Sequence, residues 1–402
     1  MPMFSSMVNN FSRHVKGPRE DKMTYKVDEF YFLTDPHEHI YQHFPSDPKW
    51  QLLGNPISME EFVRLPVVKS PFFNHRLAFA KDYSSVITVK DSFYELQLVG
   101  PRLYNFAAKL VSKDKSVASE ALQEKLLLRM VETDVVFLVN LPQPGKYYLD
   151  VYVAGSHANA SMDHACGFML NCASVARNGA KLNYPQIGPM GRLPYFEYFN
   201  MTEETHVDSY ITAHGEFVVA FTMSHAVRVT HTLQYYNYKD RSFTDCDRYA
   251  FPKHRGDSLV SFTVKCPRKG FYVMTFSAEN ASDRRATKHV VYRYIIECRA
   301  PVQNTSSFPR ASKRWQHCKL ITPQSGDLPI NADVTFRIES SVAKGMVVVI
   351  DDEWHYLEQQ GDVWQGVVNT GPDPNKALVY GRIEDNRDKY IPCLEYSIVE
   401  MR

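Results

Sequence analysis

Several stretches of this chain alternate apolar and polar residues with a period of two. Three of them share the pattern and recur along the sequence: Phe168, Leu170 and Cys172; Tyr294, Ile296 and Cys298; and Leu394, Tyr396 and Ile398. Such an alternation is typical of a β-strand that has one face in a core. The pattern therefore predicts an all-β fold built from repeated units.

A longer motif supports the repeat. The sequence Phe137-x-Val139-x-x-Pro142-x-x-Gly145-x-Tyr147 returns 125 residues later (137 to 262) as Phe262-x-Val264-x-x-Pro267-x-x-Gly270-x-Tyr272. A period of this length suits a β-sandwich domain, and internal repeats decide how a fold is interpreted. We expect Gly145 and Gly270 to occupy equivalent turns with positive φ. A third, more diverged copy closes the chain, with a turn at Pro372.

The repeats divide the chain into five predicted parts: a polar tail at 1–24, a short α/β segment at 25–70, and sandwich repeats at 71–188, 189–312 and 313–402. Within the second part, residues 25–33 are predicted to form a strand. Asp35-Pro36 and Ser58 are typical starts of short helices, because both residue types cap a helix N-terminus.

That strand would have no sheet partner in the chain, and folded proteins rarely leave an apolar edge open. We therefore expect Phe30, Phe32 and Leu33 to be covered by the two short helices and the first repeat near Phe72 and Phe73, or else by a partner. Trp50 would help to seal this junction.

Composition limits where the protein can reside in the cell. The first ten residues lack the pattern of a secretory signal, and no apolar run approaches the roughly 20 residues of a membrane helix. Seven cysteines without C-x-x-C spacing fit reduced thiols. These features predict a cytoplasmic protein without a membrane span.

The net charge is only +1, but the charges are unevenly distributed. A basic strip between residues 284 and 314 has eight Lys or Arg against the single acid Glu297. From residue 326 to the end there are 14 Asp or Glu against 7 Lys or Arg. The strip is either a solvated face that helps neighbouring domains to dock or a surface for an acidic partner.

Two clusters invite a chemical interpretation and both fall short. His39 and His43 share a helix face beside His37, but two ligands at this spacing do not close a tetrahedral metal site. Asp163-His164-Ala165-Cys166 supplies the residue types of a thiol nucleophile, yet His164 and Cys166 would lie side by side with no third group to orient them. Nucleotide-binding and hydrolase motifs are absent from the sequence. We therefore expect no catalytic residue, no metal and no cofactor.

The segment Phe30-Tyr31-Phe32-Leu33-Thr34-Asp35-Pro36, followed by Ile40-Tyr41-Gln42-His43-Phe44-Pro45 and Trp50-Gln51-Leu52-Leu53, resembles the end of the transglutaminase-like domain of hillarin and kyphoscoliosis-peptidase proteins. The resemblance implies three tandem immunoglobulin-like β-sandwiches after a short α/β remnant of that domain. In that family a Cys, His and Asp triad lies upstream of this segment. Here only 29 residues precede Phe30; none is Cys, and His14 is not followed by Trp. The chain is either a fragment or a lineage that kept the interaction half.

The resemblance implies a non-catalytic intracellular scaffold with cytoskeletal protein partners. The alternative is a portion or subunit of a transglutaminase-like cysteine peptidase whose triad lies outside this chain. Nucleic-acid binding through the basic strip is a third, disfavoured possibility, which would show steep salt dependence. The predicted partner-binding residues are Phe30, Phe32, Leu33, Arg284, Arg285, Lys288, Lys313 and Arg314.

Overall fold

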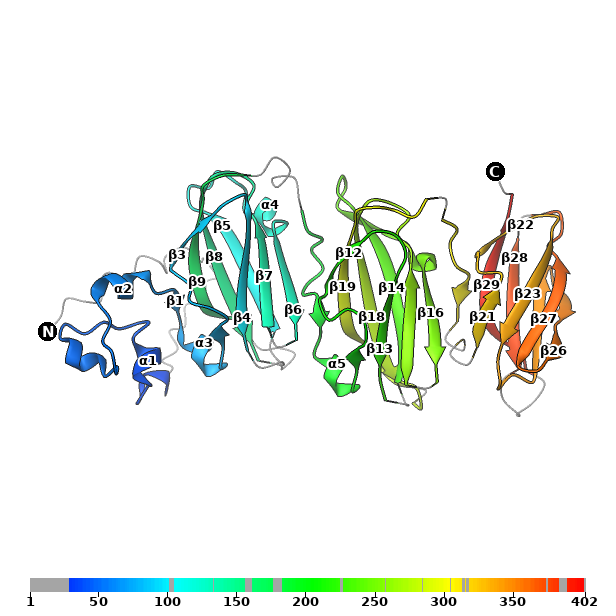
Figure 1. Cartoon of the computed structure of the whole chain (residues 1–402), viewed down its shortest axis with the longest axis horizontal. Coiled ribbons are helices and arrows are strands. Elements are labelled where there is room, and N and C mark those ends of the chain that lie inside the picture. The colour runs from blue at the N-terminus through cyan, green and yellow to red at the C-terminus, as the bar shows by residue number, and fades with distance from the viewer. Residues whose placement is uncertain are drawn as a thin grey trace, which may run out of the picture.

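Three β-sandwiches follow one another in a row, preceded by a short helical segment, in the computed structural model (Figure 1). The structure describes residues 29–400 except 101–104, 133, 156–160, 176–182, 225–226, 257, 284, 304, 313–314, 316–317, 374 and 383–388. Figure 1 shows the N-terminal segment and the third sandwich at opposite ends of the molecule.

The segment before the first sandwich contains short helices. Its elements are η2 (Glu29–Tyr31), α1 (Pro36–His39), η3 (Pro48–Gln51) and α2 (Met59–Arg64). Asp35 caps α1 and Ser58 caps α2, the latter with the reciprocal capping box to Glu61. The strand predicted over residues 25–33 is wrong from residue 29 onward, because η2 and a bend occupy that stretch; residues 25–28 lie outside the described part.

Each sandwich repeats one topology, with one larger and one four-stranded sheet. The larger sheets run β1-β9-β8-β5, β10-β19-β18-β14-β15 and β20-β29-β28-β24-β25. In each of them one short strand pairs in parallel with the long last strand of the repeat: β3 with β9, β12 with β19 and β22 with β29. All other ladders are antiparallel, as in immunoglobulin-like sandwiches. The all-β prediction is confirmed.

The first sandwich consists of β1 (Val67–Val68), α3 (Ser70–Asn74), β2 (Ala78–Phe79), β3 (Val86–Val89), β4 (Phe93–Val99), β5 (Asn105–Ser112), α4 (Ser119–Gln123), β6 (Leu126–Val131), β7 (Asp134–Asn140), β8 (Gly145–Ala154) and β9 (Asp163–Cys172). The second consists of β10 (Gly191–Arg192), α5 (Tyr195–Tyr198), β11 (Thr202–Glu203), β12 (Tyr210–Ala213), β13 (Phe217–Thr222), β14 (Val227–Asn237), β15 (Ser242–Asp245), η5 (Asp247–Tyr249), β16 (Ala250–Arg255), β17 (Leu259–Val264), β18 (Gly270–Asn280) and β19 (His289–Cys298). The third consists of β20 (Arg310–Ala311), β21 (Lys319–Thr322), β22 (Asp327–Pro329), β23 (Asp333–Glu339), β24 (Gly345–Ile350), β25 (Glu353–Tyr356), β26 (Glu358–Gln360), β27 (Val363–Asn369), β28 (Lys376–Arg382) and β29 (Ile391–Val399).

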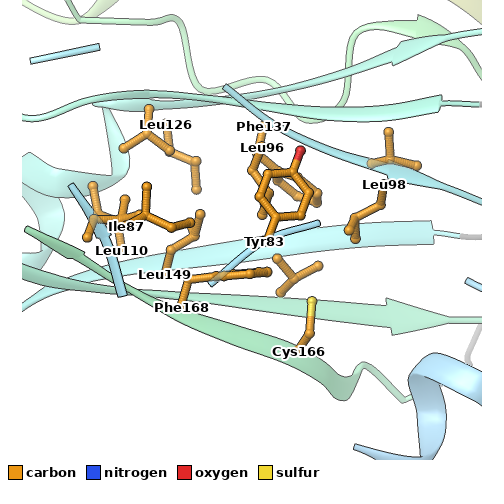
Figure 2. Packing of buried hydrophobic residues seen from close by; sticks show 14 of the residues in the cluster. Tyr83, Ile87, Leu96, Leu98, Leu110, Leu126, Phe137, Leu149, Cys166 and Phe168 are labelled. Carbon is orange, nitrogen blue, oxygen red and sulfur yellow. The ribbon is translucent and has the colours of Figure 1, made fainter. Parts of the chain in front are cut away.

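The alternating positions form the cores. Figure 2 shows Phe168 of β9 packed in the first core with side chains of the facing sheet such as Phe137 and Leu96. Leu170 and Cys172 join the same cluster, and the equivalent positions of β19 and β29 are buried in the second and third cores. Burying these side chains supplies most of the driving force for folding.

The repeated motif has a structural reason. Gly145 and Gly270 have φ of +151° and +134°, as expected, and each opens a strand that pairs with the last strand of its repeat. Two residues on, the hydroxyls of Tyr147 and Tyr272 each donate to a backbone carbonyl four residues upstream, at 2.9 Å. A tyrosine that ties down a loop in this way is a recurrent device of immunoglobulin-like sandwiches.

The first and second sandwiches pack through the outer faces of their sheets. Side chains of β6 and β7 meet side chains of β14, β18 and β19 in a shared apolar cluster: Leu127, Val136, Leu138, Tyr184, Met190, Tyr236, Phe271 and Ile295. The connecting segment adds an isolated parallel bridge between Arg129 and Met190, in which the Met130 N–H donates to the Met190 carbonyl at 2.9 Å. Arg129 of β6 pairs with Asp208 across the junction.

The second and third sandwiches are joined around one arginine. The guanidinium of Arg248, in η5, donates to the carbonyls of Phe308 at 3.2 Å and Gly326 at 2.7 Å. It also donates to Asp327 at 2.9 Å and to Ser397 at 3.1 Å. Nearby, Phe251 of β16 belongs to the core cluster of the third sandwich. The junction therefore combines an apolar contact with a polar clasp.

Candidate interaction surfaces

The N-terminal segment exposes a group of large apolar side chains. Phe30 is 9% exposed and its ring stacks on Phe73 with the centroids 5.5 Å apart. Phe32 and Leu33, by contrast, are 79% and 88% exposed, and Trp50 is 66% exposed. The expectation that this chain covers its own apolar edge is thus confirmed for Phe30. Cover by this chain is wrong for Phe32 and Leu33, which lie in the bend after η2, and for Trp50 in η3, while cover by a partner stays a prediction.

We call the exposed side chains of Tyr31, Phe32, Leu33, Trp50 and Leu52 the N-terminal apolar surface. Two of its members, Leu33 and Leu52, adopt left-handed backbone with φ of 55° and 54°. This conformation is uncommon for residues other than glycine, and asparagine tolerates it best. The segment therefore holds two leucines outward at some cost in backbone energy.

The residues of the predicted basic strip do not form one surface in the described part of the chain. Arg285 and Lys288 lie exposed in the connection before β19, whereas Arg284, Lys313 and Arg314 fall outside the described residues. Arg293 of β19 turns into the first junction, where its guanidinium donates to the Pro189 carbonyl at 3.4 Å. Pro189 belongs to the segment that leads into the second sandwich, so the docking interpretation of the strip stays a prediction.

The histidine cluster of the N-terminal segment stays a pair. The rings of His39 and His43 lie 5.2 Å apart, and burial together with the charge of His43 lowers the pKa of His39. Within the described ranges, no three His, Cys, Asp or Glu side chains converge as metal ligands would.

The residues Asp163 to Cys166 are separated by the fold. His164 lies on the outer side of β9, with its Nε2 atom 3.3 Å from Asp150. Cys166 points into the first core, as Figure 2 shows, and burial raises the pKa of its thiol. The expectation that His164 and Cys166 lie side by side is therefore wrong, because a bulge between Val151 and Tyr152 shifts the register there.

The other thiols are also protected. Six of the seven cysteines are buried, and Cys246 is intermediate. Burial raises the pKa of Cys172, Cys246, Cys266 and Cys298. Cys318 differs, because a hydrogen bond with its buried neighbour Cys393 lowers its pKa. A thiol with a raised pKa and no access for substrate is a poor nucleophile.

A cavity of about 320 Å³ lies between the second and third sandwiches. Its lining combines acidic and basic side chains, with Asp245 and Asp247 beside Arg228 and Arg310. These charges oppose one another, so the cavity favours no class of charged ligand.

An aromatic cluster on the third sandwich escaped the sequence analysis. It consists of Trp354 and Tyr356 of β25 together with Tyr380 of β28 and Tyr390. The signal available in the sequence was the alternation Trp354-x-Tyr356 directly after the acidic run Asp351-Asp352-Glu353. Period two alone cannot tell an outward aromatic pair from a core pair.

Tandem immunoglobulin-like sandwiches define the class of this protein. Comparison with known families gives the same class: residues 59–182 and 190–309 each match the family described as KY-like, immunoglobulin-like domain. These matches cover more than half of the chain, which therefore belongs to this family. No helix among the described residues is long and apolar enough to cross a membrane.

Curated relatives agree with the family. The chain is similar to kyphoscoliosis peptidase of Mus musculus, 26% identical over 385 residues, which is 94% of this chain and 55% of that protein. It is also similar to Lim and transglutaminase domain protein ltd-1 of Caenorhabditis elegans, at 26% identity over 66% of this chain and 38% of that protein. Hillarin of Drosophila melanogaster is 25% identical over 63% of this chain and 33% of its own length. The chain thus spans about half the length of the mouse relative, and the family resemblance expected from the sequence is confirmed.

Proposed function

We propose that this chain is a non-catalytic intracellular scaffold that binds cytoskeletal proteins, with the N-terminal apolar surface as one binding site. The observation that carries the proposal is the exposure of Phe32, Leu33 and Trp50 in the segment before the first sandwich. Phe32 and Leu33 are neighbours in the sequence that are both exposed, and exposed apolar groups on a folded protein commonly mark interaction sites. Aromatic residues, tryptophan above all, dominate the energy of such contacts.

The backbone at this surface supports the same proposal. Leu33 and Leu52 adopt a left-handed backbone conformation, which is unfavourable for leucine, and their side chains are not buried in this chain. Strain of this kind persists where it serves a function. A bound partner that buried both side chains would offset the cost.

The cysteines support the non-catalytic part. Cys166, the one that the sequence places beside a His and an Asp, is enclosed in the first core, and its His partner faces away. We expect the purified chain to show no thiol-dependent hydrolysis of a fluorogenic casein. Activity that is present in the wild type and lost in Cys166→Ser would overturn this part.

The alternative is that the chain is a portion or subunit of a cysteine peptidase whose triad lies elsewhere. It is favoured by the mouse relative, which is named a peptidase and of which this chain spans only 55%. Under this alternative, thiol-dependent hydrolysis should appear when the chain is joined to, or mixed with, the remaining part of such a protein.

The cytoskeletal part is tested by fractionation of cells that express the full chain. We expect the wild type in the detergent-insoluble cytoskeletal fraction and Phe32→Ser with Trp50→Ser in the soluble fraction. The matched control is Tyr198→Ser, which removes an aromatic side chain that is 73% exposed on the second sandwich. Absence of the wild type from the insoluble fraction would refute cytoskeletal binding. Equal retention of the double variant would refute the role of this surface.

A further inference from the structure

The aromatic cluster of the third sandwich stands on the outer face of its larger sheet. Trp354 and Tyr356 pair across the ladder with Val349 and Val347 of β24, so all four side chains share one face. Neither valine belongs to the core cluster of this sandwich, yet Val347 is fully buried. The aromatic rings therefore act as an outer cover for β24.

The aromatic rings nevertheless leave much of their own surface exposed to solvent. Trp354 is 47% exposed and Tyr356 is 67% exposed. The Trp354 ring stacks near Tyr380 with 6.1 Å between centroids and an interplanar angle of 17°. Tyr390 stands edge-on to Trp354 at 5.4 Å, and a Cβ atom at Gly345 would come within 2.7 Å of the Tyr390 hydroxyl. The result is a ridged surface of held aromatic rings, open to solvent.

The charge beside these rings is acidic at the turn that leads into β25, whereas Arg382 lies opposite Gly345 at the other end of β24. Three acidic residues, Asp351, Asp352 and Glu353, directly precede Trp354 in the sequence. Asp351 and Asp352 form the two-residue turn between β24 and β25, with φ of 49° and 64°. Among the described residues, the one ion pair of these carboxylates is that of Glu353 with His355, at 4.0 Å. A cationic partner would thus meet carboxylates that are not neutralised.

We propose that the cluster of Trp354, Tyr356, Tyr380 and Tyr390 is a docking surface for a proline-rich, basic segment of a partner protein. Such segments adopt polyproline II, whose ridges fit between exposed aromatic rings at little entropic cost. Arginine side chains stack on Trp and Tyr faces and pair with carboxylates. This surface is separate from the N-terminal apolar surface and lies at the other end of the molecule (Figure 1).

Addition of a strand to the free edge of β25 is the competing mode, and the structure disfavours it. β25 is four residues long and follows directly on the acidic turn. Short, charged edges are the usual protection against edge-to-edge pairing. The exposed apolar area instead lies on the face of the sheet, where polyproline recognition takes place.

The test measures fluorescence polarisation of labelled peptides with the full chain. The first probe is a nine-residue peptide made of three copies of arginine-proline-proline. The second replaces each arginine by glutamate, and the third replaces each proline by serine. We expect saturable binding of the first probe and at least about tenfold weaker binding of the other two. The glutamate probe lacks the positive charge, and the serine probe lacks the preformed polyproline II helix.

Variants locate the site. Trp354→Ala should weaken binding of the first probe at least about tenfold, whereas Tyr198→Ala, an exposed aromatic of the second sandwich, should leave it unchanged. Asp352→Asn with Glu353→Gln removes two charges and keeps a residue that tolerates the left-handed turn. This pair should weaken binding and reduce its salt dependence even if Trp354→Ala folds poorly.

Three results would overturn the proposal. They are absence of saturable binding of the first probe, equal binding of either altered probe, and full binding by both the Trp354 and the charge variants. Equal binding of the serine probe would point to strand addition, and equal binding of the glutamate probe to a purely apolar contact.

Discussion

The clasp at the second junction offers the sharpest test of how the sandwiches are held together. Arg248→Ala removes four hydrogen bonds, to Phe308, Gly326, Asp327 and Ser397. A hydrogen bond contributes roughly 0.5–1.5 kcal/mol net, and more when a charged group is left unpaired. The side chains of Arg248 and Asp327 are 26% and 32% exposed, so water compensates in part. We expect the junction to lose about 3 kcal/mol.

Trp315 reports on this junction. It is 1% exposed and its ring lies 5.8 Å from Phe251 of the second sandwich. In a urea titration, opening of the junction in Arg248→Ala should shift tryptophan emission to the red below the urea concentration at which far-UV circular dichroism changes. The same titration with Trp315→Phe in both backgrounds subtracts the other tryptophans.

Two further variants separate the clasp from general destabilisation. Gly326→Ala keeps every donor but would place a Cβ atom 2.2 Å from the Phe308 carbonyl oxygen, so it should open the same junction. Arg299→Ala, which removes an exposed ion pair with Glu297, should change stability by no more than about 0.5 kcal/mol. Arg248→Ala with wild-type emission and wild-type midpoint would refute the reasoning.

Other predictions follow from single positions. Gly145→Val and Gly270→Val should each lower the free energy of unfolding by roughly 1–3 kcal/mol, because both glycines have a positive φ that valine rarely adopts; wild-type melting curves would count against this. Burial lowers the pKa of His231 below its ordinary value of 6.5, so the unfolded chain binds more protons and stability should fall as pH drops below that value. His231→Gln should flatten this fall in pH-dependent urea titrations, and an unchanged slope would contradict it. Phe30→Ala should destabilise the first sandwich by roughly 2–4 kcal/mol, whereas Phe32→Ala should change thermal unfolding little, because only Phe30 is enclosed.

The sequence predicted the strands well because their signal is local. Period-two alternation in β9, β19 and β29 reflects which side chains face the core, and a strand needs no distant information to show it. The repeated glycine and tyrosine were equally readable, since the turn that they hold spans only a few residues.

The surfaces were harder to predict because exposure depends on what lies opposite. Phe32 and Phe30 are two residues apart in one apolar run, and only the bend after η2 sends the first outward and the second against Phe73. Trp354 and Tyr356 alternate like core residues, but they lie on the outer face of the sheet. The core is filled by side chains on the opposite face of β24, such as Met346 and Val348. Arg248 finds its partners 60 to 149 residues away, so nothing near it in sequence marks it as a clasp.

The junctions give these surfaces a fixed relation to each other. The N-terminal apolar surface and the aromatic cluster lie on the first and last parts of a row whose members share an apolar cluster at one junction and the Arg248 clasp at the other (Figure 1). A partner that engages both surfaces gains from a high effective concentration only while the spacing between them is held. Arg248→Ala should therefore leave binding of the arginine-proline peptide unchanged, because the cluster itself is intact, but weaken any partner that bridges both ends. Equal loss for the single-site peptide would mean that the clasp shapes the third sandwich itself rather than its position in the row.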